Sequence, residues 1–318
     1  MSPARTSSKL IPIGWIGGAG VSSQSSAINR FYEAVAKQSR GQVVALFADC
    51  REDADRMAGQ CGGQLYRSLR SFCQHERLGA ILCLEMGWFG DWGIEQIRQL
   101  GVPTLVGNPL GATFSHRVIE RLAAEEREGC LLIPAATWRF TPATLRLREL
   151  LATRLGPLRQ VVIRLRSASR NSPAVLQAID WCRTLLVPSG GELHWQGQTV
   201  SRGYGFTGSG RSLTFPSVVV QIESASEPPR ESEAAAVCFE AQLEAERGEA
   251  IVRGDSRIEW SCGSDTQAES LESDRTAEQV MLDLFLRRVV GGLVPAPNWG
   301  DLQHVVALWH AANEGADG

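Results

Sequence analysis

Lysine is nearly absent from this chain. Of its 318 residues 32 are basic, and only Lys9 and Lys37 are lysines, so the remaining 30 are arginines. A phosphate-binding loop of the type Gly-x-x-x-x-Gly-Lys requires a lysine at a fixed place, and neither lysine follows such a run. A catalytic Tyr-x-x-x-Lys pair is missing too, because Tyr32 and Lys37 are one residue too far apart. The sequence therefore excludes both of these chemistries.

The cysteines and histidines form no metal-binding pattern. The eight cysteines include no Cys-x-x-Cys pair, and the five histidines include no His-Glu-x-x-His. Several cysteines lie in apolar runs, such as Leu82-Cys83-Leu84, where a free thiol behaves as a small buried hydrophobe. We therefore expect no metal site and no disulfide framework, which favours a reducing, cytoplasmic compartment.

Long apolar runs and strongly basic regions are also missing. No stretch approaches the roughly 20 apolar residues that span a bilayer, and the net charge of -3 gives no reason to expect a nucleic-acid partner. Residues 10–21 follow two basic residues and resemble a signal peptide, but their four glycines favour a turn between a strand and a helix. We predict a globular protein with neither a membrane nor a nucleic-acid partner.

The first half of the chain alternates between two hydrophobic patterns. Continuous apolar runs, typical of buried strands, occupy residues 10–16, 42–48, 80–84, 104–106 and 131–135. Helical spacing of apolar residues occupies 25–38, 51–59, 94–100 and 115–129. This alternation predicts an α/β domain with a doubly wound parallel sheet over residues 1–137. In such sheets ligands bind beyond the carboxyl ends of the strands.

The second half, residues 138–318, has a different pattern. Helices are predicted at 142–155, 174–186, 276–290 and 301–313. Strands are predicted at 158–166, 192–196, 212–223, 235–243, 249–253 and 256–260. Because few helices separate these strands, we predict an α+β domain with a largely antiparallel sheet.

A glycine cluster follows the first predicted strand and opens a helix. Its candidate cofactor-binding residues are Gly14, Gly17, Gly18, Gly20 and Ser23. The spacing Gly-x-Gly-x-x-Gly is met at Gly18 and Gly20 only, with Ser23 at the third place. Glycines let the backbone approach a pyrophosphate, and the helix amino terminus supplies N–H groups. The alternative is a turn that only lets the helix pack on the strand.

An acid and an arginine follow the second predicted strand. Asp49 ends that strand, where a carboxylate can accept hydrogen bonds from the adenosine ribose of NAD. Arg51 could instead accept the 2′-phosphate of NADP. The choice between NAD and NADP stays open, and Asp49 could also be an ordinary loop acid.

Four segments resemble the Gfo/Idh/MocA oxidoreductase family. They are Val106-Gly-Asn-Pro-Leu110, the run 138–157 with its Arg-Phe-Thr-Pro-Ala start, the helix 174–186 and the closing run 285–295. The resemblance covers residues 10–313. It implies a Rossmann-type domain, a second domain with a large open sheet, a nicotinamide cofactor, and hydride transfer on a sugar- or cyclitol-like, polyhydroxylated molecule. It also implies a homo-oligomer formed through the C-terminal sheet.

The chain departs from this family where protons are exchanged. The family's catalytic lysine, usually in Glu-Lys-Pro, is replaced by Asn108 before Pro109, and the histidine of its active-site helix is replaced by Gln177. Neither amide can exchange a proton near pH 7. Of these catalytic positions only Asp180 stays ionisable, and Glu85 is placed at the cofactor edge.

Two hypotheses follow from these departures. In the first, the chain is an NAD(P)-dependent oxidoreductase in which Asp180, Asn108 and Gln177 orient the substrate. In the second, it is a catalytically silent relative that acts as a sensor, scaffold or partner subunit. Loss of general acid–base catalysis, worth about 10²–10⁴-fold, favours the second. Asp180 could also be a paired helix acid, and Arg139 could form either a structural ion pair or a contact with an anionic ligand.

Overall fold

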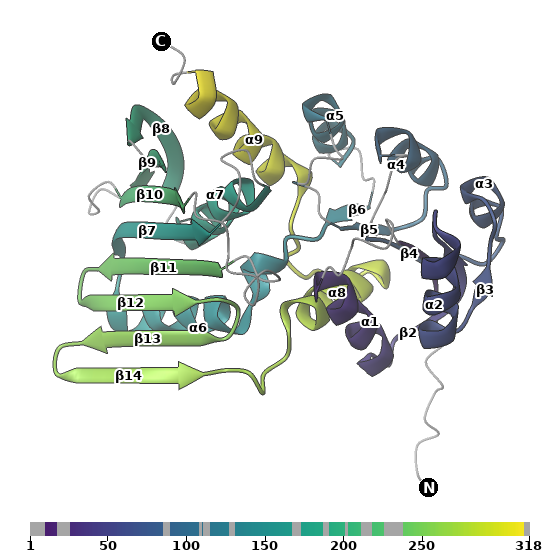
Figure 1. The fold of residues 1–318 in the computed structure, drawn as a ribbon, viewed down its shortest axis with the longest axis horizontal. Helices are drawn as coiled ribbons and strands as arrows, with labels where there is room; N and C mark the ends of the chain where they lie inside the picture. Colours follow the sequence, from purple (N-terminus) through teal and green to yellow (C-terminus); the bar gives the residue numbers. More distant parts are fainter. Residues whose placement is uncertain are drawn as a thin grey trace, which may run out of the picture. The chain divides into compact units, whose positions relative to one another are not determined.

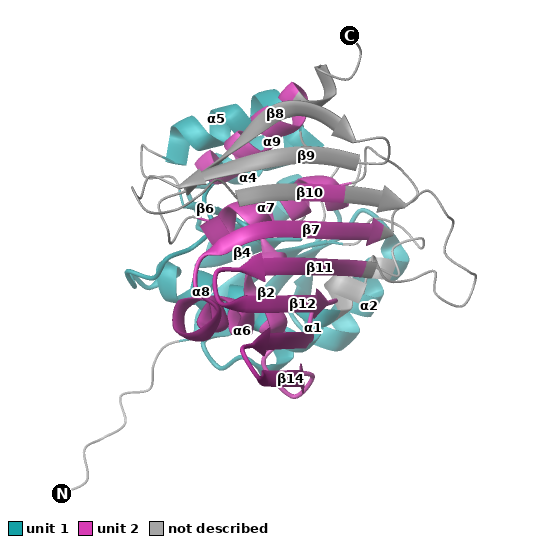
Figure 2. Ribbon diagram, turned by 90° about the vertical axis from the view of Figure 1, so that its left-hand side faces the viewer, with its two compact units in different colours: residues 1–135, 278–299 teal, residues 136–277, 300–318 magenta. Residues whose placement is uncertain are grey.

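The chain forms two compact units (Figure 2). Its computed structural model describes residues 10–17, 26–84, 90–107, 110, 115–126, 131–166, 173–186, 191–200, 203–210, 218–225 and 238–314. Unit 1 comprises residues 1–135 and 278–299, and unit 2 comprises residues 136–277 and 300–318. Unit 1 thus includes a segment, 278–299, that the sequence analysis places with the second domain.

Unit 1 is built on a parallel sheet of six strands (Figure 1). The strands are β1 (Ile11–Ile16), β2 (Gly41–Phe47), β3 (Gln64–Leu65), β4 (Ala80–Cys83), β5 (Thr104–Val106) and β6 (Leu132–Pro134). Their order is β3-β2-β1-β4-β5-β6, and every neighbouring pair is parallel. The predicted doubly wound parallel sheet is confirmed. The strand order reverses between β1 and β4, which is where such sheets bind ligands.

Unit 1 also contains helices, and all but the last of them connect two of these strands. They are α1 (Ser26–Lys37), α2 (Arg51–Cys61), α3 (Leu69–Cys73), α4 (Gly90–Arg98), α5 (His116–Glu126) and α8 (Ala277–Val289), of which the residues from Glu278 belong to this unit. Strand β3 and helix α3 were not predicted, because a strand of two residues and a helix of five are too short to display a period.

Polar contacts explain why residues 278–299 belong to unit 1. Arg30 of α1 donates from Nε to Oε1 of Glu278 at 2.7 Å, and Glu278 is almost fully buried. At the far end of the segment, Trp299 donates from Nε1 to the backbone oxygen of Leu132 at 2.8 Å. A buried carboxylate without its partner would be costly, so the Arg30 contact stabilises this packing.

Unit 2 is built on a sheet of eight strands. These are β7 (Leu158–Arg166), β8 (Gly191–Val200), β9 (Gly203–Gly210), β10 (Val218–Ala225), β11 (Cys238–Ala245), β12 (Gly248–Arg253), β13 (Arg257–Cys262) and β14 (Asp265–Ser270). Their order is β14-β13-β12-β11-β7-β10-β9-β8. Among these described strands only β7 and β10 pair in parallel, so the predicted mostly antiparallel α+β domain is confirmed.

Two strands of unit 2, β9 and β14, were not predicted from the sequence, for different reasons. β9 has a glycine at both ends and at two interior positions, and this composition indicates turns. β14 is exposed along almost its whole length and has no alternating apolar pattern. Both strands form because the neighbouring strand supplies hydrogen bonds, which is information that their own residues do not contain.

Helices cover one face of the unit 2 sheet. They are α6 (Pro142–Leu150), which continues as a π-helical turn over Leu151–Leu155, and α7 (Pro173–Leu186). A further helix, α9 (Trp299–Glu314), belongs to this unit from Gly300. α6 contacts β12 and β13, whereas α7 contacts β7, β8 and β10. The covered face is a row of buried side chains in register across the strands: Ile222, Ile163, Ala241, Val252 and Ile258.

The opposite face of this sheet is polar. Glu240 lies between two register partners, Arg164 and Arg253, and pairs with them at 3.2 and 3.3 Å. Arg253 also pairs with Glu259 on β13. Antiparallel sheets commonly have one solvated face, and this ladder of opposite charges is of that kind. The homo-oligomer through this sheet stays a prediction.

Candidate functional site

Two predicted cofactor residues, Gly17 and Asp49, follow β1 and β2 at the carboxyl edge of the sheet. Ile16 and Phe47 are register partners, and the N–H of Gly17 donates to the carbonyl of Phe47 at 3.1 Å. Gly17 is buried, and Asp49 follows β2 by two residues with its side chain exposed. The beginning of the glycine segment and the acid therefore lie on the same edge of the sheet.

The carboxyl ends of β4 and β5 continue this edge. Leu84 donates its N–H to the carbonyl of Ile16 at 3.0 Å, and Gly107 donates to Cys83 at 2.7 Å. A Cβ on Gly107 would lie 2.3 Å from the carbonyl oxygen of Leu84, so only glycine lets the chain pass there. Asn108 and Pro109 follow directly in the sequence.

Gly14 lies inside β1 and not in the loop after it. Its register partners are Ala45 and Ile81. An added Cβ would lie 2.6 Å from Cζ of Phe72 on α3, so this glycine makes room for α3 to pack on the sheet. The structure gives Gly14 a packing role, which sequence spacing could not distinguish from a cofactor contact.

Trp15 is a residue at this edge that the sequence analysis did not single out. Its indole is fully buried and stacks on Tyr32 of α1, with ring centroids 4.6 Å apart and an angle of 22° between the planes. Its Nε1 is buried, and within the described part of the chain no atom accepts a hydrogen bond from it. A Cβ on Gly17 would lie 3.0 Å from this nitrogen. An indole in a buried strand is itself a signal, because its N–H normally needs an acceptor.

Arg51 is the first residue of α2, close to Asp49 in the sequence. Its side chain is 93% exposed, and its Nε lies 3.8 Å from Oδ2 of Asp55. Such an exposed pair is weak and leaves the guanidinium available for an anion. A buried glycine, an unpaired buried N–H and a carboxylate at one sheet edge fit a dinucleotide, which needs close backbone approach, donors for its phosphates and an acceptor for its ribose.

Several predicted site residues lie outside the described residues: Gly18, Gly20, Ser23, Glu85, Asn108 and Pro109. Their roles stay predictions. Among the residues that are described, no three His, Cys, Asp or Glu side chains gather as a metal centre would require. Within the same residues, no helix has both the length and the apolarity to cross a bilayer.

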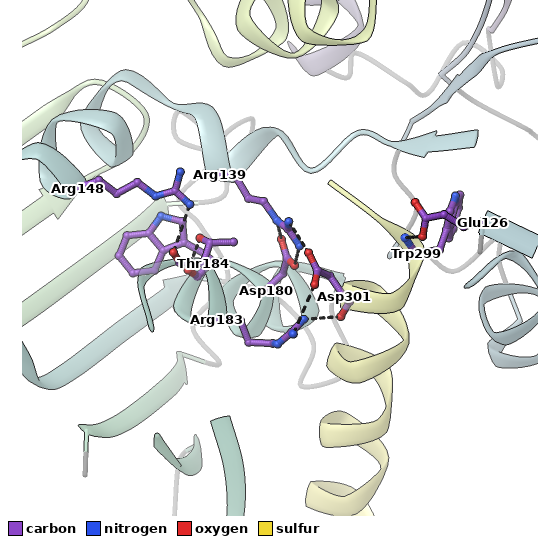
Figure 3. A network of polar contacts seen from close by, with 9 residues as sticks. Glu126, Arg139, Arg148, Asp180, Arg183, Thr184, Trp299 and Asp301 are labelled. Atoms are coloured by element: carbon purple, nitrogen blue, oxygen red, sulfur yellow. Dashed lines mark hydrogen bonds and ion pairs between the residues drawn. The ribbon is translucent and has the colours of Figure 1, made fainter. Parts of the chain in front are cut away.

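In unit 2, Asp180 belongs to a buried ion-pair network (Figure 3). Its side chain is buried in α7, and both of its carboxylate oxygens accept hydrogen bonds from Arg139, the Nε contact measuring 2.8 Å. Arg139 donates a further bond from Nη1 to Oδ2 of Asp301 at 2.9 Å. Arg183 donates to the backbone oxygen of Asp301 at 2.7 Å. The network joins the 3₁₀ turn before α6 to α7 and α9.

The electrostatics of this network keep Arg139 charged. Burial alone lowers the pKa of Arg139, but the hydrogen bonds and charges of Asp180 and Asp301 outweigh burial and raise that pKa above its ordinary value. Arg148 has the opposite shift, since burial and the neighbouring charge of Arg139 lower its pKa. Arg148 donates to the backbone oxygen of Thr184 in the last turn of α7, at 3.3 Å. Of the two interpretations left open for Arg139, the structure shows the ion pair.

Gln177 lies on α7 one helical turn before Asp180 and is half-buried. The predicted active-site helix therefore brings Gln177 and Asp180 together. The carboxylate of Asp180 is occupied by Arg139, and the amide of Gln177 does not titrate near pH 7. Within the described part of α7, neither of these two predicted residues offers a group poised to exchange a proton.

No family model and no curated protein matches the sequence. Solved structures do match, over almost the whole chain. The 3-ketoreductase KijD10 from Actinomadura kijaniata, in complex with NADP, has a TM-score of 0.72 at 15% identity, covering 96% of this chain and 98% of that one. The UDP-N-acetylglucosamine 3-dehydrogenase GnnA from Acidithiobacillus ferrooxidans has a TM-score of 0.71 at 15% identity, with the same two coverages.

A third similar structure is GenD2 from gentamicin A biosynthesis, in complex with NAD. Its TM-score is 0.72 at 14% identity, and the match covers 100% of this chain and 97% of that one. At such identities the likeness establishes architecture and no more. The strand orders and the two-unit organisation agree with it: the chain has the two-domain fold of the Gfo/Idh/MocA-type dehydrogenases.

Proposed function

We propose that unit 1 binds NAD(P) at the carboxyl edge of β1 and β2. The observation that supports this proposal is the hydrogen bond from Gly17 to Phe47, since it joins the start of the glycine segment to the end of the strand that precedes Asp49. Similar structures that hold NADP or NAD support it. The bound cofactor would supply hydride chemistry, and the chain would bind and orient it.

The residues at this edge would each contact a different part of the cofactor. Gly17, with Gly18, Gly20 and Ser23, lets the backbone approach the pyrophosphate, and Glu85 and Pro109 border the cofactor. Asp49 accepts hydrogen bonds from the adenosine ribose. Arg51 binds the 2′-phosphate when the cofactor is NADP.

We further propose that the chain is an oxidoreductase for a sugar- or cyclitol-like, polyhydroxylated substrate. The amides of Asn108 and Gln177 would donate and accept hydrogen bonds to substrate hydroxyl groups. Because Arg139 engages both oxygens of Asp180, this carboxylate would act by fixing the orientation of α7 and not by accepting a proton.

A second candidate function is supported by the same contact. If no group exchanges the proton, the chain is a catalytically silent NAD(P)-binding protein that works as a sensor, scaffold or partner subunit. The engagement of Asp180 by Arg139 favours this candidate, since it occupies the only ionisable member of the predicted trio.

Titration of the purified protein with NADH and NADPH, followed by nicotinamide fluorescence, tests the binding proposal. We expect saturable binding of at least one dinucleotide. Asp49→Ala should weaken binding of NADH, whereas Arg51→Ala should weaken NADPH only. Absence of binding by either dinucleotide would overturn the proposal.

A dehydrogenase screen over sugars and cyclitols then separates the two candidates. Turnover of any substrate by the wild-type protein supports the oxidoreductase, and tight dinucleotide binding without turnover supports the silent protein. Asn108→Lys combined with Gln177→His should raise turnover only if the substrate pocket is retained, because the double variant introduces two groups that can exchange protons.

A further inference from the structure

Trp15 differs from other buried tryptophans of this chain. Trp181 donates from Nε1 to Oγ1 of Thr144, Trp260 to Oε1 of Glu269 and Trp299 to the carbonyl of Leu132, at 2.8, 2.7 and 2.8 Å. Trp15 is 0% exposed, yet its Nε1 has no acceptor within the described part of the chain. A buried donor left unpaired costs stability, so such a group in a folded protein requires an explanation.

The position of Trp15 points to that explanation. Side chains alternate along a strand, so the indole of Trp15 and the missing side chain of Gly17 lie on the same face of the sheet. A Cβ on Gly17 would lie 3.0 Å from Nε1 and 3.7 Å from Cε of Met57. Glycine therefore places no side chain against the polar edge of the indole at the carboxyl end of β1. Stacking on Tyr32 fixes the ring in this orientation.

We propose that the indole N–H of Trp15 is a hydrogen-bond donor held for a pyrophosphate oxygen of the bound dinucleotide. This inference rests on the proposed function, because it takes the carboxyl edge of β1 as the dinucleotide site. Phosphate oxygens only accept hydrogen bonds, which matches a group that only donates. Binding would supply an acceptor that the described part of the chain lacks, so part of the binding free energy would come from satisfying this donor.

Two phenylalanine substitutions in unit 1 provide a matched comparison. Trp15→Phe removes a donor without leaving any partner unpaired, whereas Trp299→Phe leaves the carbonyl of Leu132 without its donor. We expect Trp15→Phe to weaken the binding of NADPH and of ADP-ribose about tenfold, the ratio that one lost hydrogen bond gives. Binding of adenosine, which has no phosphate, should not change. Trp299→Phe should lower the melting temperature more than Trp15→Phe and leave dinucleotide affinity unchanged.

The indole ¹⁵N–¹H resonance of Trp15 gives a direct measurement on the wild-type protein. We expect it to move downfield and to exchange more slowly with solvent when ADP-ribose or NADPH is added, and to stay unchanged with adenosine. This readout does not depend on turnover or on whether Trp15→Phe folds, because selective labelling can assign the resonance.

The outcomes separate this inference from the proposed function. If neither NADH nor NADPH binds, the dinucleotide site itself is wrong. If a dinucleotide binds while the Trp15 resonance stays where it was, the dinucleotide site stands and the donor role is overturned. A resonance that is already downfield and protected in the free protein also overturns it, since the acceptor is then a buried water.

Discussion

The contact between Arg139 and Asp180 changes the role expected for Asp180 from proton transfer to structural support. A carboxylate on a predicted active-site helix is a natural candidate for proton transfer, but here both of its oxygens accept hydrogen bonds from one guanidinium. A buried pair of this geometry is far more costly to break than an exposed one. At the scale of the residue, the contact assigns Asp180 to the stability of unit 2.

Replacement of that carboxylate tests this assignment. We expect Asp180→Asn to lower the free energy of unfolding by about 3 kcal/mol, because Arg139 is left partly unpaired in a buried site. The measurement is urea unfolding followed by circular dichroism. Asp265→Asn, at an exposed pair with Arg154, should change it by less than about 0.5 kcal/mol. A variant as stable as wild type that has lost turnover would instead place Asp180 among the reacting groups.

Gly17 is the second residue whose role a substitution can isolate. Gly17→Ala places a methyl group 3.0 Å from the Trp15 nitrogen, and we expect it to weaken NAD(P)H binding in the fluorescence titration. Gly59, on α2, is the matched control, since a Cβ there meets nothing within 4 Å. Gly59→Ala should stabilise the helix by about 0.5–1 kcal/mol and leave binding unchanged. If Gly17→Ala and Gly59→Ala bind NAD(P)H with equal affinity, Gly17 does not contribute to the dinucleotide site.

At the scale of the element, the packing of α6 on the β13–β14 hairpin depends on one carboxylate. Arg146 of α6 donates from Nε and Nη2 to Glu269, both at 2.9 Å, and Trp260 donates to the same carboxylate at 2.7 Å. The hydrogen bond from Arg146 is the main reason that the pKa of Glu269 lies below its ordinary value. Strand β14 has few apolar contacts, so this carboxylate is a large part of what holds it to α6.

The stability contributed by Glu269 should therefore depend on pH. Because the pKa of Glu269 is lower in the folded state, its stabilising effect is fully present above the pKa of the unfolded state, about 4.3. This stabilisation is lost as the pH falls through the pKa of the folded state. We expect Glu269→Gln to lower the melting temperature at pH 7 and to approach wild type in more acidic buffer. Glu272→Gln, at an exposed pair with Arg257, is the control and should have little effect at either pH. A constant difference across this range would contradict the prediction.

The elements that sequence periodicity predicted share a physical property: each buries a continuous apolar pattern of its own. The runs at β1, β2 and β4, and the helix α7, are of this kind, and their bounds agree with the predicted ranges within a few residues. Of the elements that it missed, β3 and α3 are too short, β14 is mostly exposed, and β9 has four glycines among its eight residues. Their conformation comes from neighbouring strands and helices, which a local pattern cannot report.

At the scale of the whole molecule, unit 1 is assembled from two separated stretches of chain. The segment 278–299 returns to unit 1 through the pair of Glu278 with Arg30 on α1 and through the bond from Trp299 to Leu132 on the edge strand β6. Unit 2 is thus an insertion between residues 135 and 278, with a short return at the end.

Because unit 1 is discontinuous in the sequence, a fragment that contains only its first stretch should not fold stably. We expect residues 1–135 alone to be unstable and to bind no NAD(P)H, because the fragment lacks the segment that covers part of its core. The same residues joined by a linker to 278–299 should regain a cooperative thermal transition, measured by calorimetry. A stable fragment 1–135 with wild-type affinity would show that the returning segment is dispensable.

The fold class follows from the sequence alone, because alternating strand and helix patterns in the first half and closely spaced strands in the second allow few architectures. The sequence also located the glycine segment and Asp49, since both adjoin strands with clear patterns of their own. Three findings required the folded chain: Gly14 packs against Phe72, Arg139 occupies Asp180, and the indole of Trp15 has no acceptor among the described residues. Each of these depends on a contact between residues distant in the sequence, and such contacts have no local period from which to be inferred.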